Sequence, residues 1–250
     1  MKVLITGASS GIGADMARIL NKQGHDLVLV ARDKQNLEKI KKELDGNVKI
    51  IAMDISSTFN CMRLYNKVKK ENIDILINNA GFGVFGNFND TKLDKELDMI
   101  DLNIKAVHTL TKLFLADFKK RNSGYILNVS SSAAFLSGPL MASYYATKGY
   151  VLQLTEAIYE ELRREGSNVY IGVLCPGPVN TNFNKTAGVK FSVKAMESDV
   201  VAKYAIDKMF KRKLIIIPGI INKIGVFMTR LLPRKLLLKI NYNIQKGKSE

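Results

Sequence analysis

Short runs of Val, Ile and Leu alternate with longer amphipathic stretches along the whole chain. Seven runs predict strands, at residues 3–5, 27–30, 48–52, 73–78, 125–130, 169–175 and 214–217. Several are almost continuously apolar, as parallel strands covered on both faces require. Between them, apolar residues recur at helical spacing, for example in residues 36–44 and 151–162. This alternation predicts right-handed crossovers and an α/β fold with a doubly wound, mostly parallel sheet of seven strands flanked by helices.

The composition indicates one large folded domain of this class. Hydrophobic residues make up 46% of the chain and charged residues 24%, so the chain can bury a full core. Its two cysteines, Cys61 and Cys175, lie far apart without metal-ligand spacing, which favours a reduced, cytoplasmic setting and no metal site. The chain opens directly on a predicted strand, and no apolar run approaches about 20 residues. We therefore expect neither a signal peptide nor a spanning helix.

A glycine-rich turn follows the first predicted strand and precedes a helical stretch at residues 14–20. Gly7, Gly11 and Gly13 stand in the order G-x-x-x-G-x-G. Glycines permit a tight turn and let backbone N–H groups approach a pyrophosphate at the N-terminus of the helix. An ordinary strand-to-helix turn also uses glycines, but the position on the first strand of a β-α-β unit favours a dinucleotide site. We therefore expect a Rossmann-type sheet.

The spacing of this turn resembles that of the short-chain dehydrogenase/reductase family, and similar motifs continue along nearly the whole chain. They are Asn78-Asn79-Ala80-Gly81, Asn103 at 25 residues after Asn78, Ser131 at 13 residues before Tyr144, Y-x-x-x-K at Tyr144 and Lys148, and P-G-x-V-x-T from Pro176 to Thr181. Each motif alone is common. Their shared order and spacing make the resemblance specific.

The resemblance implies a nicotinamide cofactor and four residues at the reacting centre, Asn103, Ser131, Tyr144 and Lys148. It also implies that Asp54 contacts the adenine amino group. The cofactor site that it implies consists of Gly7, Ser9, Ser10, Gly11, Ile12, Gly13, Arg32, Asp54, Ile55, Asn79, Ala80, Gly81, Tyr144, Lys148, Pro176, Gly177, Val179 and Thr181.

The end of the second predicted strand indicates which cofactor is preferred. A site for NAD usually carries an acid there that binds the ribose 2′-hydroxyl, but here Ala31 and Arg32 occupy these positions. A guanidinium can pair with the 2′-phosphate of NADP, and the resemblance assigns this contact to Arg32 and Ser9. Alternatively, Arg32 is only solvated and Asp33 is the ribose acid. Because Asp33 more simply caps the next helix, we expect NADP(H) to be preferred over NAD(H).

Tyr144 and Lys148 are four residues apart, so on a helix both side chains project from one face. A tyrosine with a pKa near 10 is a poor base at neutral pH. A nearby lysine ammonium and an oxidised nicotinamide would lower that pKa, so the tyrosine could give a proton in reduction and take one in oxidation. Tyr145 is three residues from Lys148 and fits the motif less well.

The resemblance implies that Ser131 holds the substrate carbonyl oxygen, and that Asn103 kinks its helix and holds a water on the proton path. The alternatives are a plain serine loop and a packed polar side chain. By the same resemblance, substrate-facing positions are mainly aromatic, which suggests a lipophilic carbonyl compound: Phe82, Phe85, Phe135, Leu136, Phe183 and Phe191. Residues 182–197 have little periodicity, and we expect them to form a mobile lid.

Much of the net charge of +15 lies near the C-terminus. Residues 211–250 contain ten Lys or Arg and one Glu, a net of +9, so the charge is not spread as for a nucleic-acid-binding protein. We expect a Rossmann-type domain at residues 1–218 and a basic helical extension at residues 219–250. In the extension, Pro233 would separate two amphipathic helices at a first-turn position. This tail resembles that of a bacterial short-chain dehydrogenase subgroup grouped with DltE-like reductases.

Three interpretations of the extension remain open. Its helices pack on the domain or on a sister subunit, rest on an anionic membrane surface, or bind an acidic protein such as an acyl carrier. The resemblance implies a homo-oligomer, either a tetramer or a dimer. We expect a homodimer built from the helices at residues 103–119 and 144–163.

The sequence thus predicts an NADP(H)-dependent oxidoreductase that reduces a lipophilic aldehyde or ketone, or oxidises the matching alcohol. One alternative is a reductase of 3-oxoacyl thioesters on an acyl carrier protein. An alternative of another class is a non-catalytic, NADP(H)-binding regulatory protein. The presence of Asn103, Ser131, Tyr144 and Lys148 together argues against the last.

Overall fold

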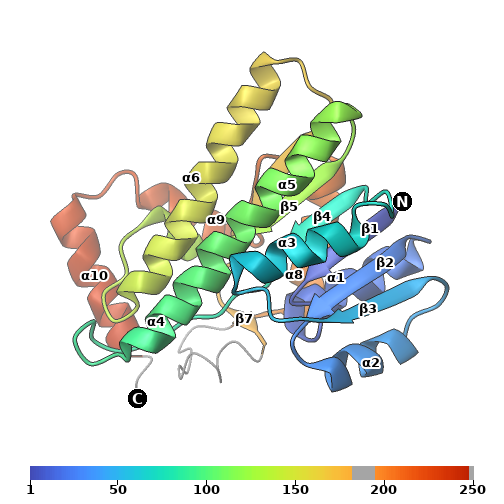
Figure 1. Ribbon diagram of the computed structural model, residues 1–250. Helices are drawn as coiled ribbons and strands as arrows, with labels where there is room; N and C mark the ends of the chain where they lie inside the picture. The colour runs from blue at the N-terminus through green and yellow to red at the C-terminus, as the bar shows by residue number, and fades with distance from the viewer. Residues whose placement is uncertain (182–194, 248–250) are drawn as a thin grey trace.

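A sheet of seven parallel strands forms the centre of the molecule (Figure 1). The computed structural model describes residues 1–181 and 195–247. The strand order is β3-β2-β1-β4-β5-β6-β9, and every neighbouring pair is parallel. All seven predicted strands are present, as β1 (Lys2–Thr6), β2 (Asp26–Ala31), β3 (Val48–Ala52), β4 (Ile75–Asn78), β5 (Tyr125–Val129), β6 (Tyr170–Leu174) and β9 (Ile215–Ile216).

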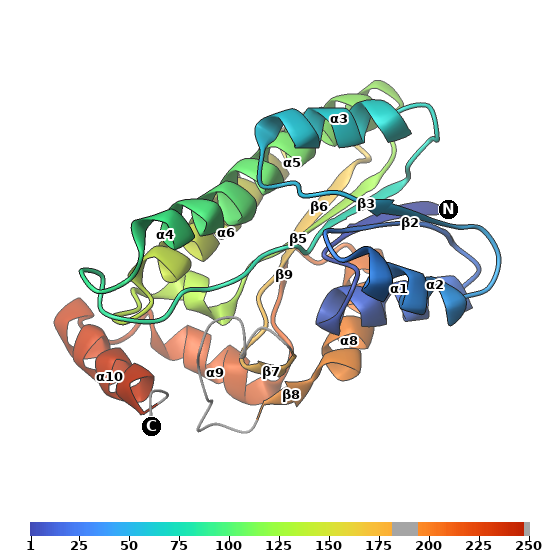
Figure 2. The ribbon, with the colours of Figure 1, turned by 60° about the horizontal axis from the view of Figure 1, so that its bottom comes forward.

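Helices cover both faces of this sheet (Figure 2). One face packs against α1 (Gly11–Lys22), α2 (Lys34–Lys42) and α8 (Ser198–Phe210). The other packs against α3 (Thr58–Val68), α5 (Val107–Lys120) and α6 (Ala142–Arg164). Because strands with two covered faces need apolar side chains on both, β1, β4 and β6 consist almost entirely of buried residues. The prediction of a doubly wound Rossmann-type sheet is confirmed.

The connections at one end of the sheet carry less regular structure. Helix α4 (Leu93–Ile100) continues into α5 through a π-helical turn, η1 (Asp101–Ala106). A short 3-10 helix, η2 (Ser132–Phe135), follows β5. Two strands of two residues each, β7 (Val179–Asn180) and β8 (Met196–Glu197), pair with each other outside the main sheet. Their length is below what periodicity in the sequence can reveal.

The C-terminal extension forms two helices, α9 (Ile220–Met228) and α10 (Arg234–Lys246). Pro233 lies one residue before α10, where we expected it inside the first turn. Helix α10 lies at the end of the molecule opposite α2, and α9 lies between α10 and the β7–β8 pair (Figure 2). Within residues 1–181 and 195–247, no helix combines the length and the apolar character needed to cross a bilayer.

Candidate active site

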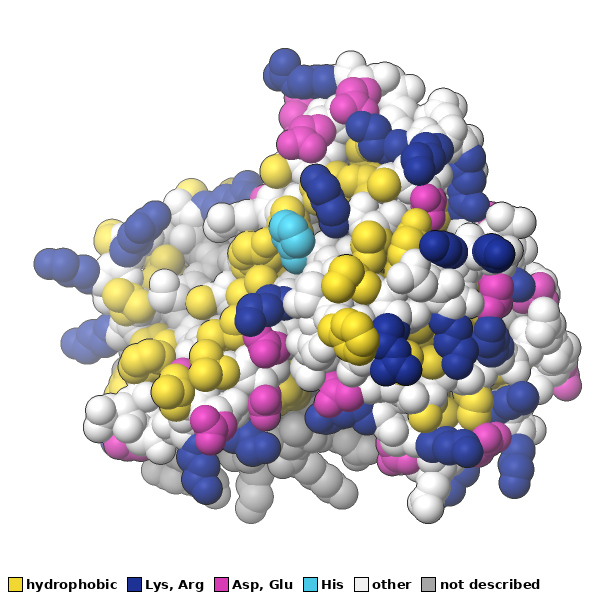
Figure 3. Space-filling view, in the orientation of Figure 1, with side chains coloured by type: hydrophobic (Ala, Val, Ile, Leu, Met, Phe, Trp, Pro, Cys, Tyr) yellow, Lys and Arg dark blue, Asp and Glu magenta, His cyan; other side chains and the backbone are white. Residues whose placement is uncertain are grey.

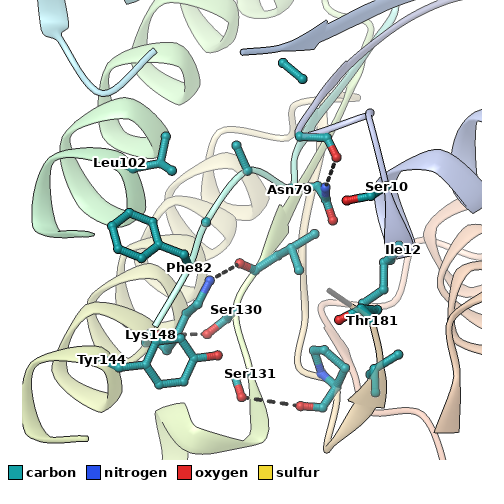
Figure 4. Close-up of a pocket in the computed structure, with 18 of the residues that line it drawn as sticks. Ser10, Ile12, Asn79, Phe82, Leu102, Ser130, Ser131, Tyr144, Lys148 and Thr181 are labelled. Carbon is teal, nitrogen blue, oxygen red and sulfur yellow. Dashed lines mark hydrogen bonds between the residues drawn. The ribbon is translucent and has the colours of Figure 1, made fainter. Parts of the chain in front are cut away.

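One cavity of about 390 Å³ lies at the carboxyl ends of the central strands. The order in which successive strands are added to the sheet reverses between β1 and β4. In open α/β sheets, ligands bind at such a switch point. The cavity is lined by every predicted cofactor residue except Gly13, which lies directly behind the turn, and also by Ser131. Residues separated by more than 100 positions in the sequence therefore meet at one site (Figure 4).

The glycine turn approaches the β4 loop too closely for side chains. An ideal Cβ at Gly7 would stand 2.8 Å from the Ala80 Cα, and one at Gly13 would stand 2.5 Å from the Gly7 carbonyl oxygen. Gly7 and Gly11 also have φ values of +66° and +54°, in the left-handed region that favours glycine. Helix α1 begins at Gly11 with its backbone N–H groups toward the cavity. This cradle fits the pyrophosphate of a dinucleotide.

Side chains of β1 and of the loop after β4 hold the cradle in place. The Asn79 Nδ2 amide donates to the carbonyl oxygens of Thr6 and Gly7, at 3.0 and 3.1 Å. The Thr6 hydroxyl accepts hydrogen bonds from the backbone N–H groups of Asn79 and Ala80. Thr6 was not among the residues predicted for the site, because a threonine at a strand end gives no separate signal in the sequence.

A cation and an acid stand together at the mouth of the cavity beyond β2. The Arg32 guanidinium lies 3.9 Å from the Asp54 carboxylate, and 69% of the Arg32 side chain is exposed. The Asp33 carboxylate accepts a hydrogen bond from the Asn36 backbone N–H and caps α2, as predicted. Arg32 thus has room to rotate toward a second anion beside Asp54. The Asp33 carboxylate, in contrast, is held in place as the N-cap of α2.

The hydroxyls of Tyr144 and Ser131 lie beside each other in the cavity (Figure 4). Tyr144 comes from α6 and Ser131 from the end of β5, so the middle serine of the Ser130–Ser132 run faces the tyrosine. The Ser130 hydroxyl instead donates to the Lys148 carbonyl oxygen, 2.7 Å away. Tyr145 also lines the cavity, but its hydroxyl accepts a hydrogen bond from the Gln245 amide of α10. Of the two adjacent tyrosines, Tyr144 is therefore the one beside Ser131.

Burial raises the pKa of Tyr144 above that of a free tyrosine, and the neighbouring Ser131 hydroxyl only partly opposes this shift. An apolar environment disfavours the phenolate because it cannot solvate the charge. The lowered pKa was expected with an oxidised nicotinamide beside the ring and stays a prediction for that state, whereas in the protein alone the pKa is shifted in the opposite direction. A second positive charge beside the ring would be needed to reverse the shift.

Lys148 is buried beneath the Tyr144 ring. Its ammonium lies 5.8 Å from the centre of that ring and donates to the Val129 carbonyl oxygen at 3.1 Å. Burial lowers the pKa of Lys148 to about 8. At neutral pH the lysine is thus still charged, and the spacing of four residues on α6 does place both side chains toward one cavity.

Asn103 lies in the π-helical turn η1, so its helix is irregular at this residue. The buried Asn103 amide binds the Phe82 backbone on both sides, accepting from its N–H and donating to its C=O. It also donates to the Thr147 hydroxyl at 3.1 Å. An ideal Cβ at Gly81 would stand 2.8 Å from the Asn103 Oδ1. Asn103 therefore joins the loop after β4 to α6 behind the cavity rather than lining it.

The residues predicted for the substrate side lie in different places. Phe82 lines the cavity. Phe85, Phe135 and Leu136 are not among the lining residues. Phe85 packs against the cluster that contains Met99 and Met141, and Phe135 packs against the cluster that contains Val151. Phe183, Phe191 and most of the predicted lid lie outside the described residues. Apolar lining residues that the sequence did not single out include Leu102, Ala133 and Met141.

Comparison with known proteins gives consistent matches over most of the chain. Residues 1–190 match the family model described as short chain dehydrogenase. An uncharacterized oxidoreductase of Staphylococcus epidermidis is 33% identical over 202 residues, which cover 80% of this chain and 86% of that protein. The very-long-chain 3-oxoacyl-CoA reductase of Homo sapiens is 33% identical over 192 residues, covering 73% of this chain and 60% of that protein.

A solved structure shares both the fold and the sequence. A short-chain dehydrogenase from Sphingobium yanoikuyae, in complex with NADPH, superposes with a TM-score of 0.81 at 32% identity. The match covers 88% of each chain. The similarity therefore extends over the sheet and the cavity, well beyond a single motif.

Proposed function

Because the chain belongs to the short-chain dehydrogenase/reductase family of oxidoreductases, we propose that it reduces a lipophilic aldehyde or ketone with NADPH, or oxidises the matching alcohol with NADP. The observation that carries this proposal is that Tyr144, Ser131 and Lys148 line the same cavity as the glycine cradle. A proton donor and a dinucleotide site that share one cavity are what a carbonyl reduction requires.

The cofactor would be held by the glycine cradle, by Asp54 and by the loop from Pro176 to Thr181. When bound, it supplies or accepts the hydride. We propose NADP(H) as the preferred form because Arg32 is exposed at the cavity mouth and no acid takes its place at the end of β2. The similar Sphingobium yanoikuyae enzyme was solved with NADPH, which supports this choice.

Tyr144 would give its phenolic proton to the carbonyl oxygen while the carbonyl carbon takes the hydride. The raised pKa keeps the phenol protonated before reaction, so the donor is in the correct state. The Lys148 ammonium beneath the ring would stabilise the phenolate that remains. The Ser131 hydroxyl would hold the carbonyl oxygen within reach of the phenol. Asn103 would act as a positioning residue, since it fixes the backbone of the loop after β4.

A lipophilic substrate is proposed because the lining beside Tyr144 is mainly apolar, with Phe82, Leu102, Met141 and Ala133. The second candidate is the reduction of a 3-oxoacyl thioester. The observation in its favour is the human very-long-chain 3-oxoacyl-CoA reductase among the relatives. A homodimer formed through α5 and α6 stays a prediction.

The test is NADPH oxidation, followed by absorbance, with a panel of aldehydes, ketones and 3-oxoacyl thioesters, with NADH run in parallel. We expect turnover with apolar aldehydes or ketones, and faster turnover with NADPH than with NADH. Turnover confined to the thioesters would replace the leading proposal by the second candidate. Tight NADPH binding without turnover of any compound would favour a regulatory protein.

A further inference from the structure

Helix α10 turns polar side chains toward its own domain and apolar side chains toward solvent. Asn241 and Gln245 are 5% and 1% exposed, and they bond to the Ser137 carbonyl oxygen and the Tyr145 hydroxyl. The exposed large apolar side chains of the same helix are Leu236, Leu238, Ile240, Tyr242 and Ile244. An amphipathic helix whose only contact were with its own domain would show the reverse arrangement. The outer face of α10 therefore suits an apolar environment outside the domain.

Helix α9 extends this apolar surface. Ile221 is 80% exposed, the highest exposure among the large apolar side chains of the described residues. The others on or just after α9 are Ile220, Ile224, Phe227, Met228 and Leu231. Residues 219–247 carry more than half of the exposed large apolar side chains of the described chain. We call residues 219–247 the extension surface.

The extension surface is also basic. Between residues 219 and 247 the sequence has six cations and no Asp or Glu: Lys223, Arg230, Arg234, Lys235, Lys239 and Lys246. All six are exposed. At the edge of the molecule where Figure 1 places α10, Figure 3 shows Lys and Arg side chains interleaved with hydrophobic ones. Cations and exposed apolar groups therefore occupy the same face.

We propose that the extension surface docks on the interfacial region of an anionic lipid bilayer. The apolar side chains would enter the boundary between headgroups and acyl chains, while the cations would bind the anionic headgroups. The two helices are 9 and 13 residues long, so they suit an orientation in the plane of the bilayer rather than across it.

Charge argues for a lipid surface over a second copy of the chain. A two-fold contact of this surface with itself would place six cations against six identical cations with no acid between them. An acidic protein partner would satisfy the cations but would bring polar side chains against the apolar ones. An anionic bilayer satisfies both kinds of group.

The docked helices are fixed to the rim of the cavity by specific contacts. Gln245 of α10 bonds to Tyr145, which lines the cavity. Asn222 of α9 packs where a side chain at Gly177 would stand, on the other rim. A bilayer that binds the extension surface would therefore meet the protein at this end of the cavity.

The test is flotation of the whole protein with phosphatidylcholine vesicles, with and without about one third phosphatidylglycerol. We expect binding to the anionic vesicles only, and its loss as NaCl is raised from about 50 to about 500 mM, since screening shortens the reach of the charges. Equal binding to both vesicles, or no binding to anionic vesicles at low salt, would overturn the proposal.

Two variants with matched controls separate the parts of the surface. The charge variant is Arg234→Glu/Lys235→Glu/Lys239→Glu, and its control is Lys39→Glu/Lys41→Glu/Lys42→Glu on α2, which has the same net charge. The apolar variant is Ile221→Ser/Phe227→Ser, and its control is Phe59→Ser/Leu93→Ser, which changes similarly exposed side chains. All these residues are exposed, so circular dichroism and thermal unfolding should match the unmodified protein.

We expect both extension variants to bind anionic vesicles at least about tenfold more weakly, and both controls to bind within about twofold of the unmodified protein. Equal loss in the α2 control would show an effect of net charge alone and would overturn the proposal. Analytical sedimentation would also reveal self-association of the protein. If self-association occurs and the apolar variant abolishes it, the extension surface binds a second copy of the chain instead of a bilayer.

Discussion

The cavity and the extension surface lie side by side in the molecule but use polar and apolar side chains in opposite ways. Around the cavity, cation and hydroxyl groups are buried and hydrogen-bonded, as with Lys148 and Ser130. On the extension, cations and large apolar side chains are both exposed, and the buried side chains of α10 are amides. The first arrangement holds reacting groups in fixed positions. The second leaves exposed apolar side chains that only a partner outside the chain could cover.

Replacing a glycine by alanine should disturb the cavity but stabilise the extension, and the larger effect is expected at Gly13 in the cavity. Gly13→Ala adds a Cβ that would stand 2.5 Å from the Gly7 carbonyl oxygen, so the cradle must distort. We expect NADPH binding to weaken by up to about 100-fold, as overpacking of a close backbone contact implies. Fluorescence titration with NADPH measures the change. Affinity within about twofold of the unmodified protein would show that the cradle does not depend on this close approach.

A buried cation and an exposed cation should differ in how they link stability to pH. Because its pKa is lowered to about 8, Lys148 loses its proton at a lower pH in the folded protein than in the unfolded chain. Between about pH 8 and 10.4 the unfolded chain therefore holds the extra proton, and the free energy of unfolding should rise with pH. We expect this rise, on the order of 3 kcal/mol, to be absent from Lys148→Met and unchanged in Lys235→Met. Denaturant unfolding across this range measures it, and equal slopes in the two variants would contradict the assignment.

Arginines at the cavity mouth and on the extension should also be separable. Arg32→Ala removes a guanidinium that is placed to pair with a 2′-phosphate, so NADPH binding should weaken about tenfold while NADH binding stays unchanged. Arg234→Ala has the same net charge and should change neither affinity. Equal weakening for NADPH and NADH in the Arg32 variant would assign Arg32 to a role other than cofactor choice.

The smallest effect is expected for a glycine of the extension. Gly225 lies inside α9, and an added Cβ there would contact nothing within 4 Å. Gly225→Ala should stabilise this helix by about 0.5–1 kcal/mol through helix propensity, without changing NADPH affinity. Slower amide hydrogen exchange in α9 would show this, whereas faster exchange would mean that the glycine has a packing role.

The sequence predicts the sheet well because its strands are nearly continuous apolar runs, which a parallel sheet buried on both faces requires. Motifs with fixed spacing also identify residues that line the cavity, such as Gly7, Tyr144 and Lys148, but of the described residues predicted for the substrate side only Phe82 lines it. The contact between α10 and Tyr145 could not be predicted. Apolar periodicity identifies the two faces of a helix, but not which face meets the domain, and in α10 the amide face does so.

The electrostatic state of Tyr144 was also beyond the sequence. The i, i+4 spacing predicts that Lys148 is near, and the structure places its ammonium 5.8 Å from the ring centre. Burial of the hydroxyl depends on the packing of several distant segments, including Met99 and Met141. That burial raises the pKa of Tyr144, so the sign of the shift required the three-dimensional structure.

The most direct test of the account compares Tyr144→Phe with Tyr145→Phe in a single turnover. Tyr144 faces Ser131 in the cavity, whereas its neighbour is bonded to α10. NADPH oxidation by a reactive carbonyl compound is followed in a stopped-flow instrument, and NADPH affinity is measured separately. We expect Tyr144→Phe to slow oxidation at least about 100-fold with nearly unchanged NADPH affinity, and Tyr145→Phe to stay within about tenfold of the unmodified protein. A Tyr144→Phe rate within about tenfold of the unmodified protein would contradict proton transfer by this residue.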